Sequence, residues 1–195
     1  NTDCNDADIN INPGMTETAN LIDDDCDGVV DNGFNQVFVT STAYAADLGG
    51  LAGADALCQS VAETAGLPTG NYKAWLSDSS VNVNTRITQS ENPYVLHDGT
   101  QIAANWADLT AFNLVGHSLN APINLDETGL TESDFRVWTG SYSTGYANPA
   151  DQCEDFTTTG PGEAIVGWTI TNNSFWSSSK FLSCSEAAHL YCIQQ

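Results

Sequence analysis

The stretch Cys184–Cys192, which reads CSEAAHLYC, decides the fold of most of this chain. It runs into Leu190-Tyr191-Cys192-Ile193, whose apolar residue types favour a buried β-strand. A cysteine inside a terminal strand predicts a disulfide to a residue far upstream, so that one bond joins the end of the fold to its beginning. Cys58 is the expected partner because it lies in the first well-defined predicted helix. Cys153 and Cys184 then remain as an inner pair.

The cysteines divide the chain into two parts. We expect one disulfide-linked domain over residues 36–195 and a separate appendage over residues 1–34, which holds Cys4 and Cys26. A chain of 195 residues with 41% apolar residues and five tryptophans can form one sizeable core and a smaller unit. Six cysteines predict three disulfides and an extracellular or cell-surface location; the alternative is a cytosolic chain with reduced cysteines.

The charge of the chain is strongly negative. Asp and Glu number 25 against four Lys and Arg, and the net charge is −21. Such a surface attracts cations and repels nucleic acids, heparin-like polyanions and anionic lipids, so none of these is an expected partner. The chain has no run of 18 apolar residues, and we expect no membrane insertion. No signal peptide is visible, and Asn1 reads as a mature or excised start.

Residues 1–34 contain nine carboxylates, no basic residue and no pattern typical of a helix or strand. The segment 23–31, DDDCDGVVD, has carboxylates at relative positions 1, 3, 5 and 9 and glycine at position 6. This spacing is typical of the first part of an EF-hand calcium loop, in which alternate oxygens point toward the ion. The expected core ligands are Asp23, Asp25, Asp27, the Val29 carbonyl and Asp31.

The loop lacks its usual final ligand, because Phe34 stands at position 12. An upstream carboxylate is therefore expected to complete the shell, and Asp3, Asp6 and Asp8 are the candidates. A Cys4–Cys26 disulfide would bring the two acidic halves together around one or two calcium ions. Asp24, at position 2, is expected to point outward. The alternative is a solvated acidic linker.

The acidic segment has a recognisable family pattern, DCNDADININPG followed by DDDCDGVVDNG. It resembles the short metal-binding repeat of bacterial copper-regulated surface proteins and of many large secreted bacterial proteins. It is also similar to thrombospondin type 3 calcium repeats. The resemblance implies calcium and a surface location, and it implies no catalysis.

The rest of the chain predicts strands and a few helices, joined by long loops. A helix over residues 51–65 ends at Gly66, and a short helix over 105–109 is capped by Asn105. Asp98-Gly99 predicts a hairpin between 93–96 and 101–103. Further strands are expected at 36–41, 72–77, 136–140, 164–168 and the C-terminus, and an irregular polar stretch at 110–136. This order indicates an α+β fold with two helices and a mostly antiparallel sheet.

Residues 36–195 also resemble a known family, the endostatin domains and, more closely, the bacterial endostatin-like proteins. The matching stretches are GGLAGADALCQSVAETAGLPTGNYKAWLSDS, PYVLHDGTQIAANW, VWTGS and CSEAAHLYCIQ. The resemblance implies a C-type lectin-like fold. It also implies that the four cysteines pair first with fourth and second with third, as Cys58–Cys192 and Cys153–Cys184.

Sites known in these families do not carry over to this sequence. The N-terminal histidine cluster that binds zinc in vertebrate endostatins is missing, and His97, His117 and His189 are expected to be surface or packing residues. Four basic residues cannot form an arginine patch for heparin. The calcium-dependent sugar triplets of C-type lectins are replaced at 121–123 and 176–179. For Asp126, Glu127 and Asp134, a solvated loop is expected rather than an ion site.

The function expected from the sequence is binding, and no enzymatic constellation is apparent. Aromatic side chains near polar loops favour contact with an extracellular glycan or protein. These are Tyr142, Tyr146, Trp168, Phe175 and Trp176, with the alternative that individual Trp side chains fill the core, as expected at Trp75 and Trp138. Two functions remain open: a calcium-binding recognition or adhesion module, or a calcium-rigidified structural block that can self-associate in a surface layer, adhesin or filament.

Overall fold

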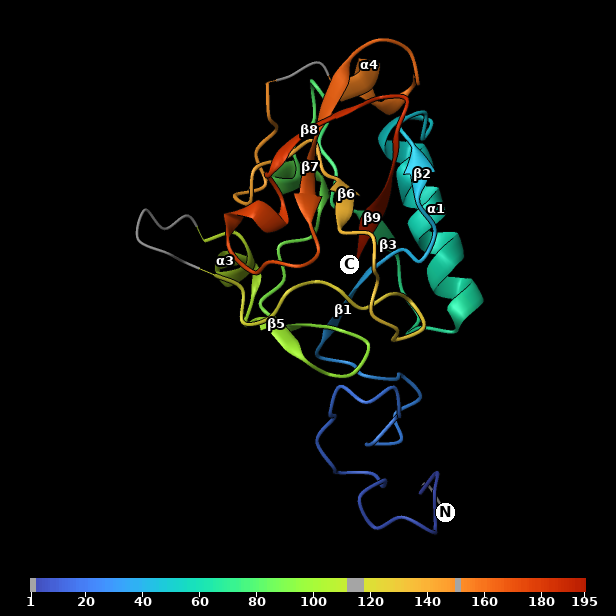
Figure 1. Cartoon of the computed structure of the whole chain (residues 1–195). Helices are drawn as coiled ribbons and strands as arrows, with labels where there is room; N and C mark the ends of the chain where they lie inside the picture. Colours follow the sequence, from blue (N-terminus) through green and yellow to red (C-terminus); the bar gives the residue numbers. More distant parts are fainter. Residues whose placement is uncertain (1–2, 112–117, 150–151) are drawn as a thin grey trace.

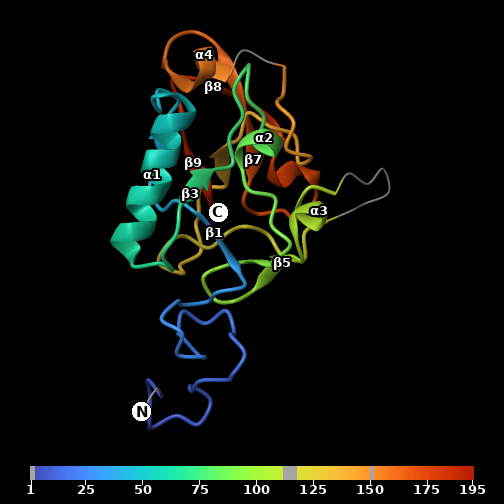
Figure 2. The same ribbon diagram turned by 180° about the vertical axis from the view of Figure 1, so that it is seen from behind.

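The computed structural model describes residues 3–111, 118–149 and 152–195. Figure 1 shows a folded body that holds the helices and strands, with the acidic N-terminal segment lying at one end of it. Figure 2 shows the same arrangement from behind. His117, one of the three histidines considered above, lies outside the described residues.

One mixed, mostly antiparallel sheet organises the body. Seven strands follow the order β5-β4-β1-β9-β6-β7-β8, and β2 and β3 also pair with β9. Only the β1–β4 and β6–β9 pairs are parallel among the described strand pairs. The strands are β1 (Asn35–Val39), β2 (Tyr44–Ala45), β3 (Tyr72–Ala74), β4 (Tyr94–Val95), β5 (Gln101–Ala103), β6 (Arg136–Trp138), β7 (Glu163–Trp168), β8 (Lys180–Ser183) and β9 (Ala187–Gln194).

The C-terminal strand β9 lies at the centre of the sheet. It is buried along most of its length, as the CSEAAHLYC stretch predicted. It pairs with β1, β2, β3 and β6. Its side chains alternate between two cores: Leu190 and Cys192 pack on the α1 side, whereas Tyr191 and Ile193 pack on the other. Trp75 and Trp138 are fully buried, which confirms that they belong to the core.

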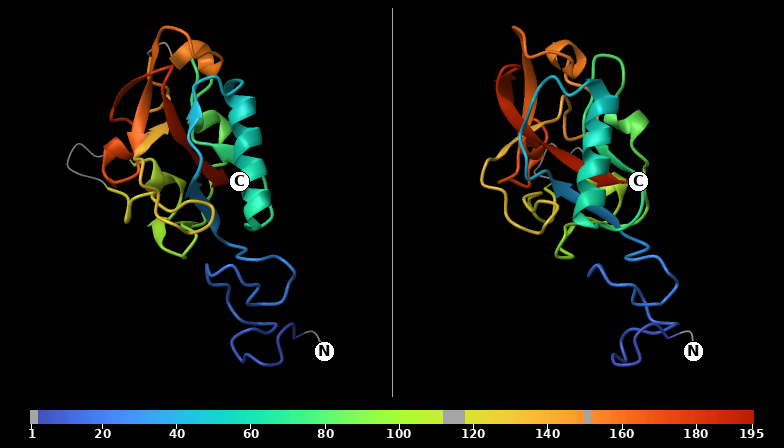
Figure 3. Two further views of the ribbon diagram at one scale, coloured as in Figure 1. Left: turned by 45° about the vertical axis from the view of Figure 1, so that its right-hand side comes forward. Right: turned by 90° about the vertical axis from the view of Figure 1, so that its right-hand side faces the viewer.

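Helix α1 (Gly50–Ala65) covers one face of the sheet (Figure 3) and buries Ala54, Cys58 and Ala62. The helix expected at 105–109 is α3 (Trp106–Leu109), and the Asn105 side chain accepts from the Asp108 N–H, so both predicted helices are confirmed. Three further short helical elements were not predicted, and neither were the strands β2 and β8. The helical elements are α2 (Val83–Arg86), α4 (Gln152–Phe156) and η1 (Ser174–Trp176).

The three predicted disulfides are present. Cys58–Cys192 joins α1 to β9, with Cα atoms 5.4 Å apart, and Cys153–Cys184 joins α4 to the residue after β8, with Cα atoms 5.5 Å apart. Cys4–Cys26 lies within the acidic segment. The described cysteines include no free thiol.

Element α4 is a single left-handed turn, although it contains no glycine. Its five residues have φ angles between 51° and 60°. This conformation costs about 1–2 kcal/mol per residue for L-amino acids. Tertiary contacts hold it: the disulfide at Cys153, the Phe156 ring against Trp138, and the Asp155 carboxylate, which accepts from the Ser79 N–H and hydroxyl.

Candidate metal site

The acidic segment is built from turns, and residues 3–34 contain no helix or strand where the structure describes them. Two links hold its halves together. The Cys4–Cys26 disulfide brings these two Cα atoms to 5.6 Å. The Asn12 N–H also donates to the Asp24 carbonyl at 2.9 Å. The loop at 3–8 therefore lies beside the loop at 23–31, as the sequence predicted.

Three carboxylates of this segment form a candidate metal site. Glu17, Asp23 and Asp25 each offer one oxygen, and these oxygens lie within 4.8 Å of one another. Oxygens bound to one calcium ion at 2.3–2.6 Å can be at most about 5 Å apart, so this spacing fits a shared ion. Asp23 and Asp25 are two of the predicted ligands, at positions 1 and 3 of the loop.

Backbone donors fix the two loop carboxylates. Both oxygens of Asp23 accept hydrogen bonds, one from the Asp27 N–H at 3.1 Å and the other from the Gly28 N–H at 2.9 Å. Asp25 Oδ1 accepts from the same Asp27 N–H at 3.0 Å. Gly28 has φ +95°, a conformation that glycine adopts without strain. The glycine at position 6 thus lets the loop fold around its own carboxylates.

Glu17 was not predicted as a ligand, because it lies outside the loop pattern. Its side chain is buried and reaches across the segment. One carboxylate oxygen accepts from the Asp25 N–H at 2.8 Å, and the other accepts from the Asp31 N–H at 3.0 Å. No spacing rule relates Glu17 to the loop. Only the intervening turn, where Leu21 has φ +63°, brings them together.

Asp27 and Asp31 lie outside the three-carboxylate cluster. Asp27 accepts from the Val29 N–H and from the Asn32 side chain. Asp31 is buried and accepts from the Asn20 and Leu21 N–H groups, each at 3.1 Å. Burial raises the pKa of Asp31, and these two N–H groups oppose that shift. A ligand role for Asp27, Asp31 and the Val29 carbonyl stays a prediction.

The expectation that Asp24 points outward is wrong. Its side chain is buried and accepts from the Thr18 N–H at 3.0 Å, from the Thr18 hydroxyl at 2.5 Å and from the Asn20 amide. The Thr18 hydroxyl is the main reason why the pKa of Asp24 is lowered. Asp24 therefore closes the 18–24 turn that positions Glu17.

The upstream carboxylates keep their predicted place beside the loop without entering the cluster. Asp3 accepts from the Asn5 N–H at 2.9 Å, and Asp8 accepts from the Asn10 N–H at 3.0 Å. Asp6 also has an interaction partner. Whether Asp3, Asp6 or Asp8 completes a metal shell stays a prediction.

The acidic loop at 124–134 is not solvated as expected. Asp126 and Glu127 are buried. Asp126 accepts from the Thr128 and Leu130 N–H groups, and Glu127 accepts from the Ser41 N–H at 2.9 Å. Asp134 pairs with Arg136 at 2.8 Å, and this hydrogen bond lowers the pKa of Asp134. Local partners thus occupy these carboxylates, which act as structural groups.

The two described histidines do not form a metal site. His189 is buried in β9 with Nδ1 2.6 Å from the Thr40 carbonyl, so it is a packing residue, as predicted. His97 is half-buried beside Gly129. The acidic segment itself has no histidine.

Four of the five aromatic side chains named from the sequence reach the surface. Tyr142, Tyr146 and Phe175 are exposed, and Trp168 is half-buried between Phe135 and Phe175. Trp176 is buried against Trp75 and Tyr191, so its expected exposure is wrong. The preceding residue, Phe175, points outward from the same 3-10 turn.

Comparison with known families supports the metal site alone. Residues 3–32 match the family model Cu-binding MopE, described as "Putative metal-binding motif". None of the curated proteins compared with the chain matches it. Among the described residues, no helix is long and apolar enough to cross a membrane. Three disulfides are typical of proteins from oxidising compartments.

Proposed function

We propose that residues 3–34 form a calcium-binding module that stiffens one end of an extracellular recognition domain, residues 36–195, of the endostatin-like, C-type lectin-like type. The observation that carries this proposal is the carboxylate cluster of Glu17, Asp23 and Asp25, inside the matched metal-binding motif. The expected role is binding, without catalysis.

The donor set favours calcium over copper, despite the name of the matched family. The cluster offers only carboxylate oxygens, which suit hard cations such as calcium. Copper prefers imidazole or sulfur ligands. The matched residues contain no histidine, their two cysteines are joined in a disulfide, and Met15 is the one sulfur side chain that remains.

Ion binding also supplies what the acidic segment lacks for folding. Nine carboxylates without a basic partner repel one another. Ile11 is the only apolar side chain of the described acidic segment that is buried, which is too little for a core. One disulfide and a bound cation therefore provide the main stabilisation of the segment.

The recognition surface that we propose lies around Tyr142. A hollow of about 370 Å³ is lined by Tyr142, Ser143, Thr144, Ser174 and Ser178. Asn84 holds the turn at residues 142–146. Its N–H donates to the Gly145 carbonyl, and its side chain donates to the Thr144 carbonyl. An exposed aromatic ring on a turn held in this way, beside hydroxyl groups, suits contact with a glycan or with a polar protein surface.

The alternative is a structural block that self-associates in a surface layer, adhesin or filament. An acidic segment stiffened by a bound ion is compatible with the recognition role and with the structural role. A monomer that binds saturably to an array of uncharged glycans and matrix proteins would favour recognition. Calcium-dependent fibres seen by electron microscopy, with no binding on the array, would favour the structural role.

A calcium titration of chelator-treated protein tests the metal site. We expect Glu17→Gln and Asp25→Ala to weaken calcium binding at least tenfold by isothermal titration calorimetry, because each removes a cluster oxygen charge. Glu163→Gln removes the same charge from β7, far from the cluster, and should bind as the unmodified chain does. Equal affinities in all variants, or tighter binding of copper than of calcium, would refute the assignment.

A further inference from the structure

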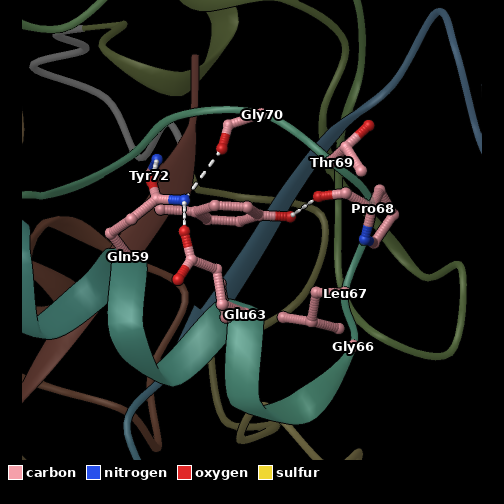
Figure 4. Close-up of a pocket in the computed structure, with 9 residues that line it drawn as sticks. Gln59, Glu63, Gly66, Leu67, Pro68, Thr69, Gly70 and Tyr72 are labelled. Atoms are coloured by element: carbon pink, nitrogen blue, oxygen red, sulfur yellow. Dashed lines mark hydrogen bonds between the residues drawn. The ribbon is translucent and has the colours of Figure 1, made fainter.

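Another hollow lies where α1 ends, away from both the metal site and the Tyr142 surface. It has a volume of about 440 Å³ and lies between the last turns of α1 and the segment 67–72 (Figure 4). Its buried wall is apolar, formed by Ala62, Leu67, Pro68 and Tyr72. Its exposed rim is polar and includes Glu63 and Thr69.

The rim carries negative charge from two sources. Glu63 stands in the last turn of α1, whose C-terminal end has a partial negative charge from the helix dipole. That turn contains no basic residue, and the Gln59 amide, which donates to Glu63 Oε1, is neutral, so no positive charge within the turn compensates the Glu63 carboxylate. A carboxylate at this end of a helix interacts unfavourably with the helix dipole.

Hydrogen bonds hold the hollow open in one shape. The Gln59 amide donates to Glu63 Oε1 at 2.9 Å and to the Gly70 carbonyl at 3.1 Å. The Tyr72 hydroxyl donates to the Pro68 carbonyl at 3.0 Å, and the Gln194 amide of β9 donates to the Thr69 carbonyl. Figure 4 shows Glu63 and the 66–70 segment arranged around the Tyr72 ring. The site is therefore preformed.

We propose that this hollow binds an arginine side chain of a partner protein. An apolar wall suits the alkyl stem of arginine, and the Glu63 carboxylate can accept two parallel hydrogen bonds from the guanidinium. The net charge of −21 favours a basic partner over an acidic one.

The partner is a different protein, not a second copy of this chain. The chain has two arginines, and both are engaged. The Arg86 side chain is largely buried, and one of its guanidinium nitrogens lies 2.5 Å from Asp55 Oδ1. It also donates to the Ala74 carbonyl. Arg136 pairs with Asp134 and Glu186. A copy would have to break one of these pairs in order to fill the hollow.

The test uses the whole calcium-loaded chain, labelled with ¹⁵N, in about 0.15 M salt. The probe is the blocked tripeptide Gly-Arg-Gly, and the same peptide with norleucine in place of arginine is the uncharged control. The arginine peptide should cause saturable shifts in the amide signals of Glu63, Gly66, Thr69 and Gly70. The norleucine peptide should cause none.

Two variants separate a specific site from general attraction to an acidic protein. Glu63→Gln keeps an exposed side chain of the same length. It should weaken binding of the arginine peptide about fivefold. Glu163→Gln removes one charge from β7 and should leave the affinity for the arginine peptide unchanged. Shifts spread over the acidic surface, or the same affinity in both variants, would overturn the proposal. Helicity measured by circular dichroism verifies that α1 is intact.

Discussion

Asp24 and Asp31 are both buried in the acidic segment, but their surroundings shift their pKa values in opposite directions. The Thr18 hydroxyl lowers the pKa of Asp24, whereas burial raises the pKa of Asp31. Stabilisation by Asp24 is therefore present above about pH 4 and is lost as the pH falls through its folded pKa. For Asp31 the sign is reversed, because its carboxyl stabilises the fold below about pH 4 and loses this effect as the pH rises.

These two residues give a prediction at the residue scale. In calcium-free protein, the Asp24 carboxyl should titrate below the ordinary aspartate value and the Asp31 carboxyl above it. A carboxyl ¹³C NMR titration measures both, and Asp24→Asn and Asp31→Asn assign the signals. A raised pKa for Asp24 would contradict its hydrogen bond from the Thr18 hydroxyl, and a lowered pKa for Asp31 would contradict its burial.

At the scale of single elements, Gly66 determines how α1 ends. It has φ +72°, and its N–H bonds to the last-turn carbonyls of Ala62 and Glu63. No atom lies within 4 Å of the position that a Cβ would take. The cost of a side chain at this position is therefore conformational and does not come from a clash.

Gly66→Ala should lower the free energy of unfolding by about 1 kcal/mol. Gly66→Asn should lower it less, because asparagine tolerates the left-handed conformation. Urea unfolding of the two variants and the unmodified chain measures the difference. No loss for alanine, or equal losses for both, would show that α1 does not end in this way.

Local patterns predicted the elements whose signal is contained in neighbouring residues. The Asp98-Gly99 turn, the 51–65 helix and the Asn105 cap are examples, since each depends on contacts within a few residues. Element α2 has only four residues, which are too few to show the periodic spacing of apolar residues that predicts a helix. The left-handed turn α4 lacks glycine and is held by Ser79 and Cys184, which are distant in the sequence.

The same limit applies to the metal site. Asp23 and Asp25 were predicted because one loop carries both, with Gly28 to turn it. Glu17 was missed because its place depends on the Asn20–Leu21 turn, whose N–H groups bind Asp31. The expectation for Asp24 was wrong for a related reason: Thr18 and Asn20 fold back over it.

At the scale of the whole molecule, the acidic segment packs against the β4–β5 hairpin. Gly99 has φ +79°, and a Cβ there would lie 2.3 Å from the Ala19 carbonyl oxygen. The Asn35 N–H also donates to the Pro93 carbonyl, where the chain enters the sheet. Close approach at Gly99 thus joins the two parts beyond their covalent connection.

Gly99→Ala should push residues 16–22 away from the hairpin and raise their amide hydrogen exchange. Gly14→Ala is the matched control, because Gly14 also has positive φ but no atom lies within 4 Å of its Cβ position. The control should leave exchange at residues 16–22 unchanged. Equal exchange at 16–22 in Gly99→Ala and in the unmodified chain would mean that the contact does not hold the two parts together.

The central claim is that a calcium ion holds residues 3–34 in their fold, and hydrogen exchange with and without a chelator tests it most directly. Chelation should raise exchange throughout residues 3–34, because their carboxylates then repel one another. The sheet and α1 should keep their protection, since two disulfides and two apolar cores hold them. Added calcium should restore the protection of the acidic segment. Unchanged exchange in residues 3–34 after chelation would contradict the account.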